Sequence, residues 1–315
     1  MKKPLIILTG PTAVGKTKLS IELAKAVSGE IISADSMQVY RRMNVGSAKI
    51  TKEEMDGVKH HLIDILEPTE EFNIALFKEY ALKALDEIYE RGNIPLIVGG
   101  TGFYIQSLVY DVDFSESSGE SSEIRKELEE LYRINGADYL HNMLNEVDEK
   151  SAALIHKNNV KRVIRAIEFY KETGTKISEH NLTQSENESP YNFIYFVLND
   201  DRKKLYERID KRVDVMFENG LVDEVMSLKK EGLTRNNISM QGIGYKEVLD
   251  CLDGITTLDE AKYIIKRDTR HFAKRQLTWF RREKSVCFID KDKFNYNDEA
   301  ILEYIKEKLK VEGII

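Results

Sequence analysis

Cysteine is scarce in this 315-residue sequence: Cys251 and Cys287 are the only two, and they lie far apart in the chain. Two distant cysteines provide neither a disulfide framework nor the close spacing of a metal knuckle. The six histidines show no zinc-type spacing either. We therefore expect a fold that depends on a hydrophobic core and contains no structural zinc.

Long apolar runs are missing as well. No stretch of apolar residues approaches the ~20 residues that a membrane-spanning helix needs, and we find no internal repeats. Strand-like sequence begins within a few residues of the N-terminus, which leaves no room for a signal peptide. We therefore expect a cytoplasmic protein with no membrane partner. Its length allows one large domain or two smaller ones.

The sequence has no overall excess of positive charge, because its formal net charge is −7. This argues against a protein that coats nucleic acid without specificity, although it allows a local basic face. Lys266–Lys284 is such a segment, since it combines eight Lys or Arg residues with two acids. Its Phe272 and Phe280 fit core positions, whereas Trp279 fits either the core or a base-stacking surface. A basic segment on an otherwise acidic chain is typical of a nucleic-acid site.

The strongest motif is Gly10–Thr17, GPTAVGKT, which fits the phosphate-binding pattern G-x-x-x-x-G-K-[ST]. An apolar strand, Pro4–Leu8, precedes it and an amphipathic helix, Lys16–Val27, follows, and this context argues against a plain glycine turn. Backbone N–H groups of such a loop surround an oligophosphate, while the lysine contacts the terminal phosphate and the threonine hydroxyl can hold Mg²⁺. We predict Thr17 as the Mg²⁺ ligand. The predicted phosphate-binding residues are Gly10, Pro11, Thr12, Ala13, Val14, Gly15, Lys16 and Thr17.

Two further strands end in a polar or a glycine-rich loop. Glu30–Ala34 is followed by Asp35, and Ile94–Val98 is followed by Gly-Gly-Thr, which ends at Thr101. Ligands of open α/β sheets gather at the carboxyl ends of strands, so Asp35 should face the same crevice as the phosphate-binding loop. Residue type alone leaves open whether Asp35 is a base or caps the next turn. The strand before Thr101 has no Walker-B acid, which favours gripping a diphosphate over ATP hydrolysis.

Hydrophobic patterning predicts an α/β fold, a P-loop kinase-like parallel five-stranded sheet flanked by helices. The two remaining strands are Phe193–Leu198 and Ser285–Ile289, while Val58–Leu66 is only strand-like. A Ser-rich linker, Glu116–Glu123, marks a change of composition, and the sequence after it is typical of helices to about Ser189. We therefore predict a catalytic core of residues 1–115 and 190–315 with an inserted all-helical domain at residues 116–189.

A cationic edge is predicted on one helix of the insert, where Lys161, Arg162 and Arg165 lie close together. Three charges alone suit a solvated helix face at least as well as an RNA contact. Beyond the insert, the segment Met240–Lys246 contains two glycines, which indicates a close backbone approach, and an aromatic residue, Tyr245, that we expect to be exposed.

A long helix is predicted from Arg202 to about Glu231. It carries Arg208 and Arg212 one turn apart. Arginines at this spacing beside a phosphate-binding loop resemble lid arginines that neutralise charge on transferring phosphates.

Six motifs in chain order resemble those of the bacterial tRNA dimethylallyltransferases, also called isopentenyl-tRNA transferases. The second and the last are far more specific than the phosphate-binding pattern. The motifs span nearly the whole chain, and the insert is the least similar part. They are GPTAVGKT at 10–17, SADSMQVY at 33–40, GGTGFY at 99–104, VKRVIRAIE at 160–168, GIGYKE at 242–247 and AKRQLTWFR at 273–281.

The resemblance implies a reaction. A dimethylallyl group would pass from dimethylallyl diphosphate to N6 of adenosine 37, immediately 3′ of the anticodon, in tRNAs that read codons beginning with U. The products would be N6-(dimethylallyl)adenosine and diphosphate, and the target base must leave its stack to react. The implied partners are the tRNA anticodon stem-loop and dimethylallyl diphosphate, with Mg²⁺ as cofactor. No feature of the sequence specifies an oligomeric state, and we expect a monomer.

The same resemblance implies roles for individual residues. Lys16 and Arg212 would balance the charge that grows as the C–O bond breaks, and Arg208 is a weaker candidate. Thr101 matches a diphosphate-contacting threonine, and Asp35 matches the carboxylate proposed to accept an N6 proton. The implied catalytic residues are Asp35, Thr101 and Arg212. The implied tRNA-binding residues are Asp35, Ser36, Met37, Gln38, Thr101, Arg125, Lys161, Arg162, Arg165, Met240, Gln241, Gly242, Ile243, Gly244, Tyr245, Lys246, Lys274, Arg275, Gln276, Trp279 and Arg281.

Two other functions fit parts of the sequence. A nucleotide or small-molecule kinase would consume ATP and leave phosphate on an acceptor, but the missing Walker-B acid and the basic segment Lys266–Lys284 argue against it. A non-catalytic RNA-binding P-loop protein would keep its biological output without Asp35. Loss of RNA modification on removal of Asp35 therefore separates a transferase from this second alternative.

Overall fold

The computed structural model describes residues 2–110, 123–185 and 187–315. The chain divides into two compact units, one built from residues 1–108 and 191–315 and the other from residues 109–190. The insert predicted at residues 116–189 falls within the second unit. The predicted Ser-rich linker Glu116–Glu123 lies outside the described residues except for Glu123, which begins a helix.

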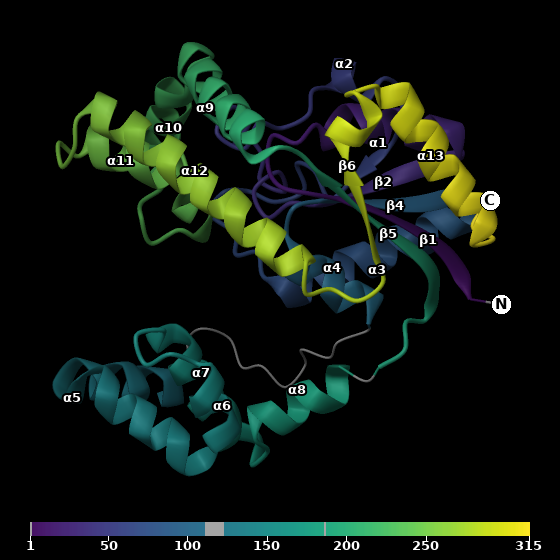
Figure 1. Ribbon diagram of the computed structural model, residues 1–315. Coiled ribbons are helices and arrows are strands. Elements are labelled where there is room, and N and C mark those ends of the chain that lie inside the picture. Colours follow the sequence, from purple (N-terminus) through teal and green to yellow (C-terminus); the bar gives the residue numbers. More distant parts are fainter. Residues whose placement is uncertain (1, 111–122, 186) are drawn as a thin grey trace. The chain divides into compact units, whose positions relative to one another are not determined.

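The first unit is built on a parallel β-sheet (Figure 1). In the part of the chain that the structure describes, the sheet has six strands in the order β3-β2-β4-β1-β5-β6. The central strands are almost wholly apolar because both of their faces are covered. The strands are β1 (Lys3–Thr9), β2 (Gly29–Ala34), β3 (His60–His61), β4 (Ile94–Gly99), β5 (Tyr191–Asn199) and β6 (Val286–Asp290).

The α/β class and the parallel sheet were predicted correctly, but the predicted number of five strands was wrong. The sixth strand is β3, which pairs with β2 at the edge of the sheet. It lies inside the strand-like segment Val58–Leu66, of which only two residues belong to the strand. Leu62 follows with a φ of 63°, a left-handed conformation that ends the extended backbone.

One predicted helix of the first unit is broken in two. The helix expected from Arg202 to Glu231 consists of α9 (Arg202–Glu218) and α10 (Leu221–Lys230), because Gly220 between them has a φ of 90°. Glycine adopts this left-handed conformation without the steric penalty of a Cβ atom. The other helices of this unit are α1 (Lys16–Ala26), α2 (Lys52–Met55), α3 (Ile74–Glu90), α4 (Gly102–Val109), α11 (Tyr245–Leu252), α12 (Leu258–Phe280) and α13 (Asp298–Val311), with 3₁₀ helices η1 (Ile238–Gln241) and η2 (Lys291–Phe294).

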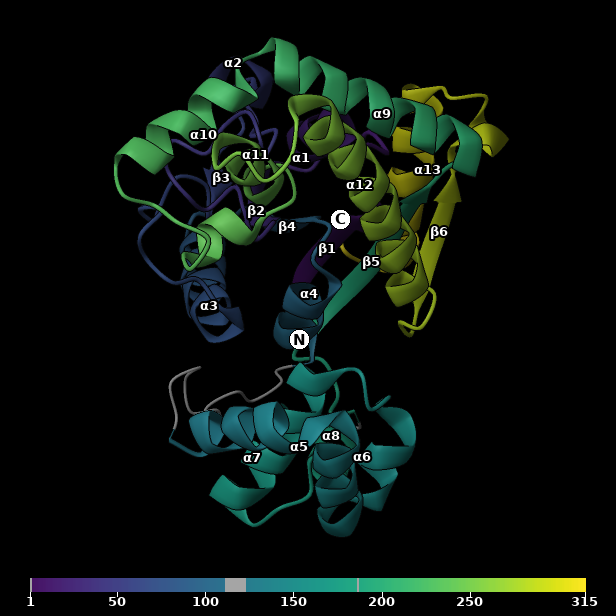
Figure 2. The same cartoon turned by 90° about the vertical axis from the view of Figure 1, so that its left-hand side faces the viewer.

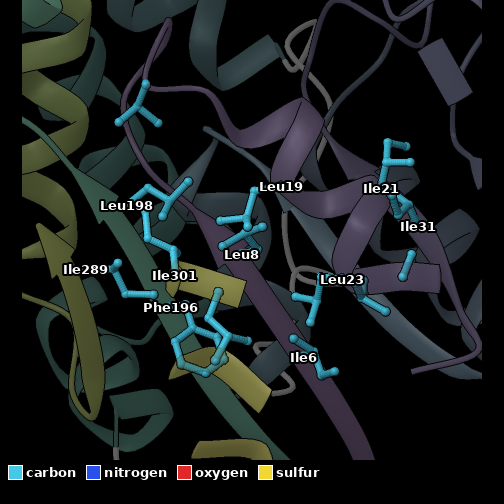
Figure 3. Packing of buried hydrophobic residues seen from close by; sticks show 14 of the residues in the cluster. Ile6, Leu8, Leu19, Ile21, Leu23, Ile31, Phe196, Leu198, Ile289 and Ile301 are labelled. Atoms are coloured by element: carbon cyan, nitrogen blue, oxygen red, sulfur yellow. The ribbon is translucent and has the colours of Figure 1, made fainter. Parts of the chain in front are cut away.

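Apolar side chains join the sheet to helices on each face. On one face Ile6 and Leu8 of β1 lie in a core cluster with Leu23 of α1, and α13 lies beside α1 (Figure 1, Figure 3). Leu5 and Ile7 alternate with these residues along β1, so they point to the opposite face, where α3 and α4 lie. Packing from both sides fixes the strand ends from which the loops of the candidate site begin.

The second unit is helical and has its own core (Figure 2). Its first element, α5 (Glu123–Val147), consists of two helical stretches separated by a kink at Gly136, where the backbone is not helical (φ 81°, ψ −178°). The remaining helices are α6 (Glu149–Leu154), α7 (Val160–Thr173) and α8 (Ile177–Ser185). Across the described ranges of both units, no helix combines the length and the apolar character needed to span a membrane.

A buried carboxylate lies at the other end of β2 from Asp35. Glu30 is 4% exposed, and its two oxygens accept hydrogen bonds from the Arg91 guanidinium at 2.7 and 2.8 Å and from Asn93 Nδ2 at 2.8 Å. His61 Nε2 of β3 lies 2.7 Å from Glu30 Oε2. Burial alone would raise the pKa of Glu30, but the hydrogen bonds from Arg91, His61 and Asn93 outweigh it and lower the pKa to about 2. The charged carboxylate therefore joins β2 to the edge strand and to the turn after α3.

We expect Glu30→Gln to destabilise the first unit by about 3 kcal/mol near neutral pH, because the folded-state pKa lies below the unfolded value. The stabilisation by Glu30 is complete above the unfolded pKa of 4.5 and is lost as the pH falls toward 2. Chemical denaturation of both proteins across this pH range measures the difference. Glu87→Gln is the matched control, since the Glu87 side chain is 44% exposed and lies 3.9 Å from Arg91. Equal unfolding free energies for Glu30→Gln and Glu87→Gln would contradict the assignment.

Candidate active site

The register of the sheet brings three loops to one edge. Thr9 of β1 and Ala34 of β2 both lie opposite Gly99 of β4, which runs between them. The phosphate-binding loop, Asp35 and Thr101 therefore leave neighbouring strands at the same level. The backbone N–H of Thr101 also donates to the Ala34 carbonyl at 3.2 Å. This is the edge at which open α/β sheets bind ligands.

The phosphate-binding loop leads directly into the N-terminus of α1. Gly15 is the N-cap residue with a φ of 99°, and no side chain caps the first turn. The first N–H groups of α1 and the positive end of its dipole therefore face the loop. Thr17 lies in this first turn and its side chain is exposed. Such a helix N-terminus is suited to bind an anion, and the phosphate-binding role of the loop stays a prediction.

Lys16 is held against the loop by its own backbone. Its Nζ donates to the Gly10 carbonyl at 3.0 Å and to the Pro11 carbonyl at 2.9 Å. Burial and, to a smaller extent, the charge of Arg212 lower the pKa of Lys16, the charge of Asp35 opposes both, and the resulting pKa is about 8. The pKa of Arg212 is likewise lowered by burial and raised by Asp35. The predicted residues Lys16, Arg212 and Asp35 thus share one electrostatic environment.

Two more cations hold the carbonyl groups of the loop. Arg208 Nε donates to the Ala13 carbonyl at 3.0 Å, and Lys291 Nζ lies 3.5 Å from the Val14 carbonyl. Arg208 also forms an ion pair with Asp200, whose side chain is fully buried. Arg208, the weaker of the two predicted lid arginines, therefore supports the loop from α9. Among the N–H groups of the loop, that of Thr12 donates to Gln276 and that of Val14 to the Pro11 carbonyl, so a phosphate would bind to other N–H groups of the loop.

Of the two interpretations left open for Asp35, the structure confirms the cap, while the role as a base stays a prediction. Asp35 Oδ1 accepts hydrogen bonds from the backbone N–H groups of Met37 at 2.8 Å and Gln38 at 3.3 Å, so it does cap the following turn. Within the described residues, Oδ2 accepts no hydrogen bond. One oxygen therefore fixes the orientation of the carboxylate, and the other is available to a substrate. Ser36, Met37 and Gln38 are all partly exposed beside it.

The loop around Thr101 packs closely against α12. A Cβ atom on Gly100 would lie 2.2 Å from Gln276 Nε2, and one on Gly102 would lie 2.2 Å from Trp279 Cδ1. A side chain at Gly102 would displace the Trp279 ring, whereas one at Gly100 would displace the end of the Gln276 side chain. The Trp279 ring also makes an edge contact with Phe103 at a centroid distance of 6.0 Å. Trp279, which fitted either the core or a stacking surface in the sequence, is partly buried against this loop.

The predicted RNA-binding residues of α12 differ in exposure. Lys274, Arg275 and Arg281 are exposed. Gln276 is 6% exposed, and its side-chain amide bonds to protein groups: it accepts from the backbone N–H of Thr12 and donates to a loop carbonyl, each at 2.9 Å. The structure therefore places Gln276 toward the phosphate-binding loop and the three cations toward solvent.

The segment Met240–Lys246 is more buried than its sequence suggested. Met240 and Tyr245 are both 0% exposed, so the expectation of an exposed tyrosine was wrong. The Tyr245 hydroxyl donates to Glu224 Oε1 at 2.8 Å, and burial, with the charge of Glu224, raises the pKa of Tyr245. Glu224 Oε2 accepts from the backbone N–H groups of Asn44 and Val45 at 2.7 and 2.8 Å. Gly244 is buried, Gln241 is exposed, and partly exposed are Gly242, Ile243 and Lys246.

In the helical unit, the predicted RNA-binding cations fall into two groups. Arg125 pairs with the fully buried carboxylate of Glu168 at 2.7 Å, and Arg165 lies 3.5 Å from the same group. Lys161 and Arg162 are exposed on α7. Arg125 and Arg165 therefore stabilise the helical core, while Lys161 and Arg162 are presented to solvent.

The sequence interpretation missed several residues that hold the site. Lys291 and Asp200 follow the strands β6 and β5 by one residue each, at the carboxyl ends where ligands and their supporting groups gather. The same rule that selected Asp35 applies to both positions. Glu224 had no comparable signal, because it lies in the first turn of α10 among ordinary surface acids.

Comparison with known proteins identifies the family. A sequence model described as IPP transferase matches residues 38–283. The chain belongs to the IPP transferase family. The tRNA dimethylallyltransferase of Lachnoclostridium phytofermentans is 57% identical over 304 residues, which cover 96% of this chain and 97% of that protein. That of Acetivibrio thermocellus is 52% identical over 310 residues, with 98% of each chain covered.

Solved structures from the same family share the fold. The full-length tRNA isopentenylpyrophosphate transferase from Bacillus halodurans matches with a TM-score of 0.73 at 46% identity, over 99% of this chain and 98% of that chain. A eukaryotic dimethylallyltransferase acting on tRNA matches with a TM-score of 0.78 at 30% identity, over 91% of this chain and 74% of that chain. The recognition and the fold class drawn from the sequence motifs are thereby confirmed.

We expect diphosphate binding to weaken as the pH rises above about 8. In the ligand-free protein Lys16 has a pKa of about 8, and its neutral amine offers no charge to a phosphate. From about pH 7.5 to about pH 9 the dissociation constant for dimethylallyl diphosphate should rise roughly eightfold, because the protonated fraction falls tenfold per unit above the pKa. Calorimetric titration in the absence of RNA measures this change.

Lys16→Arg is the control for this titration. Its guanidinium stays protonated across the whole range, so its affinity, whatever its absolute value, should not depend on pH. A wild-type profile as flat as that of Lys16→Arg would show that Lys16 does not titrate near pH 8.

Proposed function

We propose that the protein transfers a dimethylallyl group from dimethylallyl diphosphate to N6 of adenosine 37 in tRNAs that read codons beginning with U, giving N6-(dimethylallyl)adenosine and diphosphate. One observation carries this proposal. A phosphate-binding loop and a carboxylate with one available oxygen lie at the same edge of the sheet, and no acid follows β4. The relatives at 52–57% identity are named for this reaction.

The positive groups of the site suit a diphosphate leaving group. The N-terminus of α1 and Lys16 lie at the loop, and Arg212 is near enough for its charge to lower the pKa of Lys16. As the allylic C–O bond breaks, its electron pair moves to the diphosphate oxygen, and the negative charge there grows. Groups that are held in place before the reaction stabilise this charge without having to reorganise. Thr101, at the same strand edge, would bind the same diphosphate through its hydroxyl.

Asp35 is suited to accept the proton. N6 of the flipped adenine forms a bond to the allylic carbon, and the nitrogen becomes acidic as it gains positive charge. The proton then passes to Asp35 Oδ2, while Oδ1 keeps its hydrogen bonds to Met37 and Gln38. The carboxylate therefore holds its orientation throughout the transfer.

Mg²⁺ fits the site as a companion of the diphosphate. Thr17 offers an exposed hydroxyl oxygen in the first turn of α1. Among the described residues, no group of three or more His, Cys, Asp and Glu side chains could hold a metal ion. Mg²⁺ commonly binds through one or two protein oxygens together with substrate phosphates and water. Thr17 would hold the ion, and the ion would supply charge neutralisation to the leaving group.

The exposed cations suit an RNA partner. Lys274, Arg275 and Arg281 in the first unit, and Lys161 and Arg162 in the second, lie on the surface. We propose that both sets bind phosphates of the anticodon stem-loop, in a cytoplasmic enzyme that acts as a monomer. Such contacts position the RNA and make its binding sensitive to salt.

The test is mass spectrometry of nucleosides from an anticodon stem-loop incubated with the protein, Mg²⁺ and dimethylallyl diphosphate. We expect the mass of one dimethylallyl group to be added to adenosine, and this product to be lost when EDTA removes Mg²⁺. A parallel reaction with ATP in place of the allyl donor should leave the RNA unchanged. Unmodified RNA with consumption of ATP would overturn the proposal in favour of a kinase.

We expect Asp35→Asn to lower the single-turnover rate of transfer by roughly 100-fold or more, since a positioned base contributes about that factor. The amide oxygen can still cap the turn at Met37, so the loop should keep its conformation. Affinity for the stem-loop, measured by fluorescence anisotropy, should change little. A rate equal to that of the wild type would remove Asp35 from the chemistry.

A further inference from the structure

Gln276 makes two directional contacts across the candidate site. Its Oε1 accepts from the Thr12 N–H at 2.9 Å, and its Nε2 donates to the Gly100 carbonyl at 2.9 Å. The orientation of the amide is fixed by these partners, because a donor faces the oxygen and an acceptor faces the nitrogen. One side chain thus joins the phosphate-binding loop of β1 to the loop after β4.

The loop that contains Gly100 and Gly102 packs closely against α12. As described above, Cβ atoms at Gly100 and Gly102 would collide with Gln276 and Trp279, which lie three residues apart on one face of α12. A displacement of this end of α12 therefore moves the loop that carries Thr101. Through Gln276, it also changes the position of Thr12.

The opposite face of the same helix carries the cations proposed to bind RNA. In the middle of α12, Lys266 and Arg270 are already paired with Asp214 and Asp210 of α9. Farther along, Lys274 and Arg281 form no ion pair with any described residue, and both are exposed. The positive charge available to RNA is therefore concentrated at the end of α12 that contacts the two loops.

We propose that Gln276 is a positioning residue that couples RNA binding on α12 to diphosphate binding in the phosphate-binding loop; this rests on the proposed function. RNA phosphates on Lys274 and Arg281 restrict the motion of this end of α12. The restricted helix holds Thr12 and Gly100 in place through Gln276. Diphosphate binding then costs less conformational entropy, because these residues are already ordered. Thermodynamic linkage makes the effect mutual: the stem-loop tightens diphosphate binding, and diphosphate tightens stem-loop binding by the same factor.

The test measures this factor without any chemistry. Inorganic diphosphate with Mg²⁺ is titrated calorimetrically into the full-length protein, alone and saturated with the anticodon stem-loop. For the wild type we expect roughly fivefold or more tighter binding with the stem-loop. For Gln276→Met, which keeps the length of the side chain and loses both hydrogen bonds, we expect roughly tenfold weaker binding without RNA and a coupling factor near one.

Two controls separate coupling from a general loss of structure. Gln106→Met makes the same substitution on α4, at a partly exposed residue that forms no hydrogen bond with any described residue of the phosphate-binding loop, and should keep the wild-type factor. Thermal unfolding of all three proteins detects any destabilisation. Gln276→Glu keeps an acceptor for Thr12 but places a carboxylate against the Gly100 carbonyl, so it should bind diphosphate less well than Gln276→Met.

A wild-type coupling factor in Gln276→Met would overturn the proposal, whether or not its diphosphate affinity falls. In that case Gln276 would only support the loop. A factor of one in the wild type would also overturn it. Since no prenyl group is transferred in these titrations, their failure leaves the proposed reaction untouched, and a failure of the transfer assay leaves the hydrogen bonds of Gln276 to be tested.

Discussion

The site depends on one electrostatic constraint: an anion-binding loop must stay folded while it is surrounded by cations. Burial lowers the pKa of both Lys16 and Arg212, the charge of Arg212 lowers that of Lys16 as well, and the charge of Asp35 raises both. Backbone carbonyls of the loop stabilise the remaining positive charge, because they accept hydrogen bonds from Lys16 and Arg208. Holding these groups in place before the reaction costs folding stability, which the buried sheet offsets. The groups then do not have to reorganise during the reaction.

The fold was largely predictable because local patterns determine it. Continuous apolar runs indicated strands buried on both faces, and the glycine-rich motif gave the first strand, loop and helix together. The errors in the predicted elements occurred where a single residue divides or ends an element. Gly220 divides a helix whose apolar period continues across it, and Leu62 ends β3 after two residues. Periodicity averages over several residues, so it does not detect such single-residue breaks.

The candidate site was predictable only in part. Asp35 could be assigned because its position after a strand puts it at the ligand edge, whatever the remainder of the fold. The environments of Gln276 and Tyr245 could not be predicted, since they depend on contacts with residues that are distant in sequence. Gln276 reaches Thr12 across 264 positions, and Tyr245 reaches Glu224 across an inter-helix turn. The motif around Gln276 matched an RNA-binding region as a whole, and the direction of each side chain within it followed only from the packing of α12.

The parts that hold the phosphate-binding loop have a consequence for synthesis of the protein. The loop is translated long before Gln276 and Lys291, which bind its Thr12 N–H and its Val14 carbonyl. A nascent chain still on the ribosome has the complete binding motif without these supports. It therefore cannot form the finished anion site until its C-terminal helices are in place. The binding motif therefore becomes a complete site only after residues 276–291 have been made and have folded against it.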